Sequence, residues 1–266
     1  MLNMPLFARE MKNSVKLLVI IGAVLAMYVS IIIGMYDPAM MNTLDQWVDM
    51  MPELMSAMGM KAGAASILGF MSSYLYGFVL PVCPMVFCIL RGHGLVARYV
   101  ENNAMVSLLA APVKRRTVAF TQMKVLASGV FLLVLFSTVL EIVCCEAIFP
   151  GALDMPMLLL MNVGLLCLLL FIGGICFLAS CLFSDSKYSL GIGAGVPLLA
   201  YVLQMLANMG GDAEAVKYAT FFTLYNPDAL LAGENGAVVG IVALFIGALV
   251  LFACGIAAFS RRDFHI

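Results

Sequence analysis

Two carboxylates, Glu141 and Glu146, are the only strongly ionisable side chains inside the long apolar stretches of this 266-residue sequence. A carboxylate at the middle of a bilayer costs roughly 2.5 to 3.5 kcal/mol, so such a residue usually faces a cavity or a partner. Glu146 lies near the end of its stretch, where an interfacial position explains it. Glu141 is the better candidate for a translocation-path residue that lines a subunit interface. A structural hydrogen bond to a neighbouring helix is the alternative.

Motifs that would indicate an enzyme are absent from the sequence. It contains no GxxxxGK[ST], HExxH or GxSxG pattern, and no Ser-Lys arrangement stands out. The two histidines, His93 and His265, are far apart, and the eight cysteines fall inside apolar runs without CxxC spacing. We therefore expect no catalytic residue, no metal site and no cofactor on this chain.

The composition indicates that lipid is the solvent for most of the chain. Hydrophobic residues make up 64% of it and charged residues only 11%, which excludes an ordinary water-exposed surface. The net charge of -1 provides no general attraction for nucleic acid. We predict an all-α polytopic membrane protein in which residues 1–266 form a single transmembrane domain.

Six stretches are long and apolar enough to cross a bilayer as helices. They cover 17–36, 68–90, 125–149, 157–183, 188–208 and 237–259. Pro81 and Pro84 in the second stretch each remove a backbone donor and predict a kink. Glycines in the last two, including Gly191, Gly240 and Gly247, predict close helix packing.

A segment before the first span is expected to lie in the headgroup layer. Over residues 4–16, Phe7, Met11 and Val15 recur at helical spacing while cationic residues occupy other faces. This pattern predicts an amphipathic interfacial helix.

Two further segments are expected at the outer surface of the membrane. Residues 37–66 are acidic and amphipathic, with Trp47 as a membrane anchor. Residues 209–236 are too apolar for a solvated loop, and their apolar run is too short to cross the bilayer. They predict an extracytoplasmic re-entrant or surface-lying hairpin that turns near Asn226 and Pro227.

The distribution of positive charge orients the chain. Twelve of the 14 lysines and arginines lie before the first span, within 91–124, between the fourth and fifth spans, or after the sixth. By the positive-inside rule, these parts and both termini face the cytoplasm. The predicted location is therefore the plasma or inner membrane, in a multi-pass arrangement with both termini cytoplasmic.

The cytoplasmic stretch from Glu101 to Lys124 is suited to contact something. Asn102 or Asn103 can cap a short helix that Pro112 ends. The apolar side of this helix consists of Met105, Leu108 and Leu109. Three cations follow it: Lys114, Arg115 and Arg116. Such a helix fits a groove in a cytoplasmic partner. It would equally lie on lipid headgroups, with the basic residues binding anionic lipid.

At these residues the sequence resembles the type-2 ABC transporter permeases, the membrane-spanning subunits of ABC exporters. Their cytoplasmic loop reads approximately E-x-G-T-L-x-x-L-L-x-x-P-x-x-R, followed by a lysine. The matching positions are Glu101, Met105, Leu108, Leu109, Pro112, Arg115 and Lys124, while Asn103 and Ala104 replace the glycine and threonine. The N-terminal amphipathic segment, with Arg9 and Glu10 beside the apolar Phe7 and Met11, and the closing FSRRDF also resemble the family, the first through Arg9 and Glu10.

The resemblance implies a permease dimer, of identical or paralogous chains, bound to ATPase subunits that carry ATP and Mg²⁺. Residues 104–111 would form the coupling helix in a groove of the ATPase, and ATP-driven closure would push on this helix and on the N-terminal one. The cargo implied is an amphiphilic compound such as a peptide, drug or lipid, exported from the cell.

Other functional classes remain as alternatives. A membrane-anchored immunity or scaffold protein would have the same topology and use the same loop without transporting anything. A secondary transporter is disfavoured, because the sequence shows no internal repeat and only Glu141 as a coupling carboxylate. An intramembrane enzyme has the least support.

Overall fold

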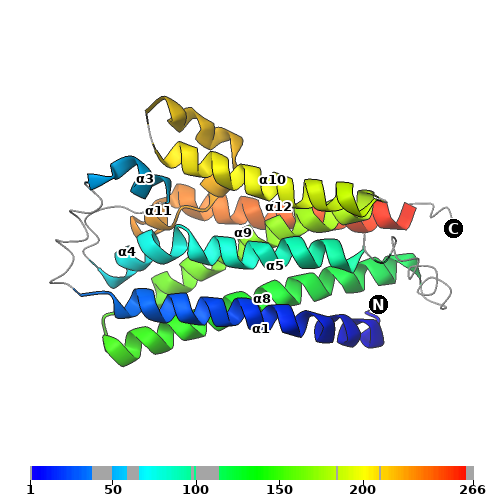
Figure 1. Cartoon of the computed structure of the whole chain (residues 1–266), viewed down its shortest axis with the longest axis horizontal. Helices are drawn as coiled ribbons and strands as arrows, with labels where there is room; N and C mark the ends of the chain where they lie inside the picture. The colour runs from blue at the N-terminus through cyan, green and yellow to red at the C-terminus, as the bar shows by residue number, and fades with distance from the viewer. Residues whose placement is uncertain are drawn as a thin grey trace.

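The computed structural model describes residues 2–37, 50–58, 66–96, 99, 114–183, 185–209 and 211–261. Within these residues every regular element is helical, and six helical spans are long and apolar enough to cross a membrane. The long helices run side by side, and α1 begins at the same end of the bundle at which α12 ends (Figure 1). The predicted all-α polytopic membrane fold is confirmed.

The first span, α1 (Met4–Gly34), is one continuous helix. The sequence predicted an amphipathic interfacial helix over 4–16 followed by a span over 17–36, and the structure has no break between the two. Whether residues 4–16 lie in the headgroup layer stays a prediction. Asn13 and Ser14 are residue types that often start a helix, but here both bond within the helix. Asn13 Nδ2 donates to Glu10 Oε1 at 3.3 Å, and Ser14 Oγ donates to the Glu10 carbonyl at 2.8 Å.

The second span is interrupted just before Pro81, one of the two prolines that predicted a kink, whereas Pro84 lies inside a helix that continues past it. It consists of α4 (Ile67–Met71), the π-helical segment η1 (Ser72–Tyr76) and α5 (Val79–Leu95). Pro81 has no N–H to donate to the carbonyl of Gly77. The Tyr201 hydroxyl donates to this carbonyl instead, at 3.4 Å. A side chain of α10 (Ser186–Asn208) thereby partners the carbonyl that the proline leaves without a backbone bond.

The third span, α8 (Arg115–Ile148), begins at Arg115 rather than at residue 125. Since α5 also continues to Leu95, the connection predicted over 91–124 is shorter than expected. Hydropathy placed the boundary after Lys124 because the preceding residues are polar. The helix nevertheless continues there, with Val118, Thr121 and Gln122 buried.

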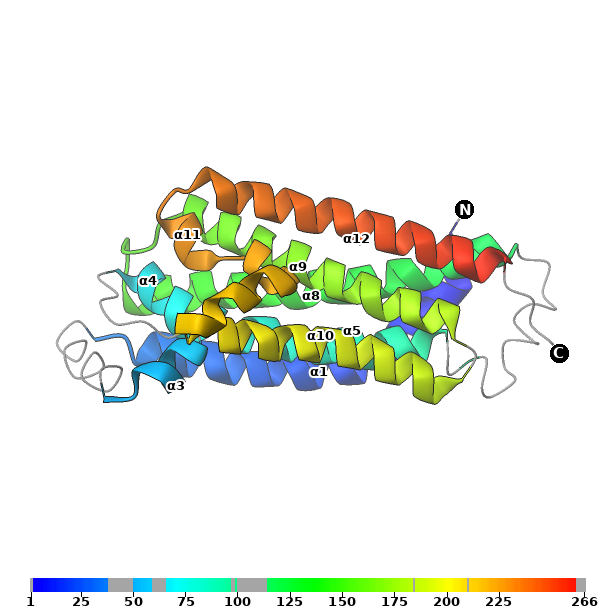
Figure 2. The same ribbon diagram turned by 90° about the horizontal axis from the view of Figure 1, so that it is seen from above.

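The remaining spans follow the prediction closely, as α9 (Met155–Leu182), α10 and α12 (Asn235–Arg261). Asp154 and Asp185 cap the first two by accepting from the backbone N–H groups of Met157 and Lys187. Helix α9 packs against α5, α8, α10 and α12 and forms the centre of the bundle (Figure 2).

Short helices cover the end of the bundle opposite the start of α1. They are α3 (Pro52–Ala57), η2 (Gly211–Ala219), η3 (Phe221–Leu224) and α11 (Pro227–Leu231). Asn226 caps α11, and the buried side chains of Phe222, Tyr225 and Leu230 fix this segment to the bundle. Whether the segment re-enters a membrane or lies on its surface stays a prediction, and Trp47 lies outside the described residues.

Glycines allow close packing of α12, as predicted, but not at every expected position. A Cβ on Gly240 would overlap the carbonyl oxygen of Leu224, and one on Gly247 would come within 2.6 Å of the Phe171 ring. By contrast, a Cβ on Gly191 or Gly195 would meet nothing within 4 Å. Of the glycines predicted to allow close packing, Gly240 and Gly247 of α12 therefore do so, whereas Gly191 and Gly195 of α10 do not.

We expect Gly240→Ala to lower the free energy of unfolding by about 1 to 3 kcal/mol, because the added methyl group meets backbone that cannot rotate away. Gly236→Ala is the matched control in the same helix, since nothing lies within 4 Å of its Cβ position. Thermal unfolding of the two variants in detergent measures the difference. Equal stability of the variants would contradict the packing described here.

Candidate functional site

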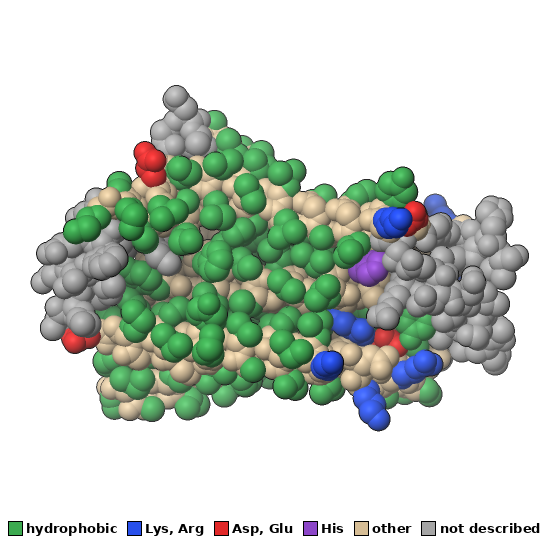
Figure 3. Space-filling model, in the orientation of Figure 1, with side chains coloured by type: hydrophobic (Ala, Val, Ile, Leu, Met, Phe, Trp, Pro, Cys, Tyr) green, Lys and Arg blue, Asp and Glu red, His purple; other side chains and the backbone are tan. Residues whose placement is uncertain are grey.

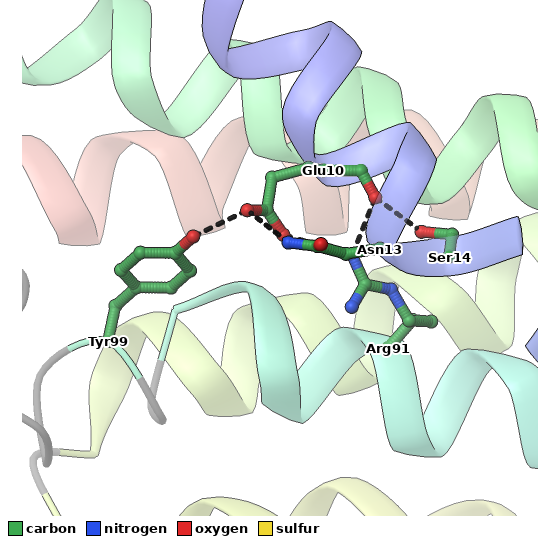
Figure 4. Close-up of polar contacts among 5 residues, drawn as sticks. All are labelled: Glu10, Asn13, Ser14, Arg91 and Tyr99. Atoms are coloured by element: carbon green, nitrogen blue, oxygen red, sulfur yellow. Dashed lines mark hydrogen bonds and ion pairs between the residues drawn. The ribbon is translucent and has the colours of Figure 1, made fainter. Parts of the chain in front are cut away.

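A buried ion pair joins α1 to α5 at the end of the bundle where α1 begins. Arg91 Nη2 lies 3.1 Å from Glu10 Oε2, and the same nitrogen donates to the backbone carbonyl of Glu10 at 3.1 Å. The side chains of Glu10 and Arg91 are 2% and 13% exposed. Figure 4 shows Arg91 and Tyr99 both approaching Glu10. The Glu10 carboxylate is thus contacted by side chains from α5 and from the residues that follow it.

Tyr99 is the third member of this cluster, and its position extends the contact beyond the end of α5. Its hydroxyl donates to Glu10 Oε1 at 2.5 Å. Burial, and then the hydrogen bond to Glu10, raise the pKa of Tyr99 to about 12. Tyr99 therefore remains a hydrogen-bond donor at neutral pH. The Glu10–Arg91–Tyr99 cluster fixes residue 99, shortly before Glu101, to the N-terminal helix.

The face of α1 that packs on the bundle could not be recognised from hydrophobic spacing. The sequence indicated Phe7, Met11 and Val15 as the apolar face of a helix in the headgroup layer, and the positions buried against the bundle are Leu6, Glu10 and Ser14. A search for hydrophobic residues at helical spacing does not find a helix face that contains a carboxylate, so the inward face of α1 was not predicted. The recurrence of Leu6, Glu10 and Ser14 at helical spacing was the available signal.

Phe7 and Met11 are half-buried beside the core, Val15 is exposed, and Arg9 is exposed. Of the four predicted N-terminal site residues, only Glu10 enters the cluster. Arg9 is available to a partner or to headgroups, and Glu10 is not.

Positive charge gathers at the same end, which we call the basic end: the start of α1, α8 and α10 and the end of α5, α9 and α12. Figure 3 shows lysine and arginine side chains concentrated there on the visible face. Lys114, Arg115 and Arg116 are all exposed and lie at the N-terminus of α8. Cations at a helix N-terminus oppose the helix dipole. Helix stability therefore does not explain their position.

The other predicted coupling residues are Glu101, Met105, Leu108, Leu109 and Pro112, and they lie outside the described residues. The capped helix expected over 104–111 stays a prediction. The structure does place the two ends of this connection, Tyr99 and Lys114, at the basic end.

Glu141 lies at the centre of a second polar cluster, inside the bundle. Its Oε2 accepts from the Tyr76 hydroxyl at 2.9 Å and from Asn162 Nδ2 at 2.8 Å. Asn162 Nδ2 also donates to the Tyr76 oxygen at 2.6 Å. The cluster joins η1, α8 and α9, and all three side chains are buried.

This position corrects the subunit-interface hypothesis for Glu141. The residue is 0% exposed within a single chain, so it does not line a surface between subunits. The alternative, a hydrogen bond to a neighbouring helix, is what the structure contains. Sequence reasoning identified Glu141 but neither partner, because Tyr76 and Asn162 lie in other helices.

The part of the chain that the structure describes holds no group of three His, Cys, Asp or Glu side chains arranged to bind a metal ion. All eight cysteines are free thiols, five of them buried. Cys176 Sγ donates to the Gly193 carbonyl at 3.1 Å, as expected of a small side chain packed between helices.

No protein-family model matches this chain, and no curated protein matches it with significance.

We expect Glu10→Ala to lower the free energy of unfolding by about 3 to 5 kcal/mol, because it leaves the Arg91 guanidinium buried without its partner. Adding Arg91→Met to Glu10→Ala should recover part of this loss. Thermal unfolding in detergent provides the measurement, with the exposed Arg9→Ala as control. Additive effects of the Glu10 and Arg91 substitutions would show that the two charges are not coupled.

Glu141→Ala should lower the free energy of unfolding by about 2 to 4 kcal/mol, since it opens a cavity and removes the acceptor for Tyr76 and Asn162. Glu141→Gln keeps an acceptor oxygen and should cost less. Exposed Glu146→Ala, in the same helix, should change stability by less than about 0.5 kcal/mol. If all three variants unfold at the same temperature, the cluster contributes nothing to stability.

Proposed function

We propose that this chain is the permease subunit of an ATP-driven ABC exporter and that its basic end couples to a separate ATPase. The six-span helical fold and the order of the loop, N-terminal and C-terminal sequence features support the proposal. Positive charge at the basic end supports a cytoplasmic position for that end, and with it for both termini.

The observation that carries the proposal is the Glu10–Arg91–Tyr99 cluster. It joins α1 to the end of α5 immediately before the segment predicted to bind the ATPase. A displacement of that segment would act on α1 and α5 together, because the cluster links both helices to residue 99. Coupling also requires that the closed ATPase bind one of two helix arrangements more tightly than the other. Equal binding to both arrangements would leave the equilibrium between them unchanged.

The exposed cations at the start of α8 add a second line of support. Lys114 and Arg116 oppose the dipole of their own helix, and an acidic surface nearby would offset that cost. In the proposed complex this surface belongs to the ATPase. Anionic lipid headgroups are the competing source of negative charge.

The proposed assembly contains this permease, a second permease that is either identical or paralogous, and ATPase subunits that bind ATP and Mg²⁺. The apolar bundle supports an amphiphilic cargo such as a peptide, drug or lipid. The net charge of -1 provides no general attraction for a nucleic-acid partner.

We expect Leu108→Asp with Leu109→Asp to abolish copurification of the ATPase while the chain stays in the membrane, because two charges would enter an apolar groove. The matched control is Ser107→Asp with Ala110→Asp, which adds the same charge to the other side of the predicted helix. Affinity purification followed by mass spectrometry measures ATPase recovery. Equal recovery from both variants would refute the coupling-helix assignment.

The same preparation separates the exporter from a membrane-anchored immunity or scaffold protein. An exporter complex in liposomes should hydrolyse ATP faster when its transported compound is present. A scaffold would hold its partner without such stimulation, whichever compound is added.

A further inference from the structure

The first turns of α1 carry three cations on one exposed face. Arg9, Lys12 and Lys16 recur at i, i+3 and i+7, the spacing that places side chains on the same side of a helix. All three are exposed, and none of them forms an ion pair with another of the described residues. We call these three residues the cationic face of α1.

The carboxylate nearest to these cations in the sequence does not offset their charge. Glu10 lies on the buried side of α1, where it pairs with Arg91 of α5 at 3.1 Å. From the sequence alone, three cations and one anion in the same segment would form a mixed surface. The structure separates them, because it turns the carboxylate inward and leaves the positive charge outside.

Further along α1 the same side of the helix becomes apolar. Ile20, Met27 and Ile31 continue the helical spacing from Lys16, and all three are exposed. Figure 3 shows positively charged side chains near the start of α1 and hydrophobic ones along the rest of its length. A ligand that fits this side of α1 therefore has an anionic group joined to a long apolar one.

The length of α1 places the change from cationic to apolar at a membrane boundary. Residues 17–34 contain no charged side chain and extend about 27 Å at 1.5 Å per residue, close to the thickness of the hydrocarbon core. When these residues cross the core, Lys16 lies at its edge, and Lys12 and Arg9 lie about 6 and 10 Å further out. Lipid headgroups begin at this depth, and long cationic side chains extend toward them.

We propose that the cationic face of α1 binds the headgroup phosphate of an anionic phospholipid, whose acyl chains lie along Ile20, Met27 and Ile31. A lipid is the occupant because a soluble phosphate compound would leave the apolar part uncovered, and a soluble protein would not follow it into the bilayer. The inference is independent of the proposed coupling to an ATPase, since it uses neither the segment over 104–111 nor the cations of α8.

The test measures lipid binding to the intact chain in dodecyl maltoside micelles by native mass spectrometry. Phosphatidylglycerol and phosphatidylcholine with identical acyl chains are the probes. We expect the first phosphatidylglycerol to bind several-fold more tightly than the first phosphatidylcholine. Lys12→Gln with Lys16→Gln should weaken phosphatidylglycerol binding by about tenfold or more, because each lysine near an anionic headgroup contributes attraction, and should leave phosphatidylcholine binding unchanged.

Two checks accompany this variant. Lys12→Arg with Lys16→Arg keeps the charge and should keep the affinity for phosphatidylglycerol. Thermal unfolding of each variant shows that it is folded, which the exposure of both lysines leads us to expect.

A matched control removes the same charge elsewhere at the basic end, through Lys114→Gln with Arg116→Gln. Thr121 of α8 lies level with Asn3, whose backbone N–H donates to its hydroxyl at 3.1 Å. Arg116 therefore lies about 20 Å from Lys12 along the bundle, which exceeds the Debye length of about 10 Å at 0.1 M salt. The affinity of this variant for phosphatidylglycerol should change by less than about twofold.

Glycerol 3-phosphate, which has a phosphate without acyl chains, distinguishes a lipid from a soluble phosphate compound. It should not displace phosphatidylglycerol at equal concentration, and displacement would overturn the proposal. Equal affinity for the two lipids, or unchanged phosphatidylglycerol binding by the folded Lys12→Gln, Lys16→Gln variant, would also overturn it. So would loss of the bound lipid when two chains associate, because a second copy would then cover the face.

Discussion

The Glu10 carboxylate is carried by α1 into a part of the bundle where water is excluded, and such a charge is unfavourable unless other groups compensate it. Arg91 and Tyr99 provide this compensation from α5 and from the start of the following connection. The arrangement at the basic end depends on this contact. Because Glu10 also lies in the continuous helix α1, movement at the connection would be transmitted along a whole span.

A different constraint shapes the opposite end. Pro81 leaves the Gly77 carbonyl without its helical partner, and the helix is interrupted there. Tyr201 partners that carbonyl and also lines a cavity, while Tyr76, in the π-helical segment, lines it and bonds Glu141. The interruption therefore places polar groups beside a hollow in an otherwise apolar bundle. A buried charge with its partner lies at the basic end, and a cavity that Asp228 borders lies at the opposite end.

The positions of the six spans could be predicted from hydropathy, because each is a long apolar run and lipid requires helices. The first residues of the spans were harder to predict. The charged residues of 4–16 suggested a segment separate from the first span, and the polar first turns of α8 were assigned to the connection before it. Glu141 stood out as a carboxylate in an apolar run, but Tyr76 and Asn162 did not, because a sequence shows spacing within a helix and not contacts between helices. The inward position of Glu10 could not be predicted for the same reason.

The central claim is that an ATPase binds this chain at the segment joined to the Glu10–Arg91–Tyr99 cluster. Photo-crosslinking in intact cells tests it most directly, with a crosslinkable amino acid placed at residue 108 and, as a control, at Tyr218, which is 85% exposed and lies near the opposite end. The account predicts an adduct at residue 108 with a protein that contains a P-loop, and none at residue 218. An adduct with lipid alone at residue 108, or the same P-loop protein captured at both positions, would contradict it.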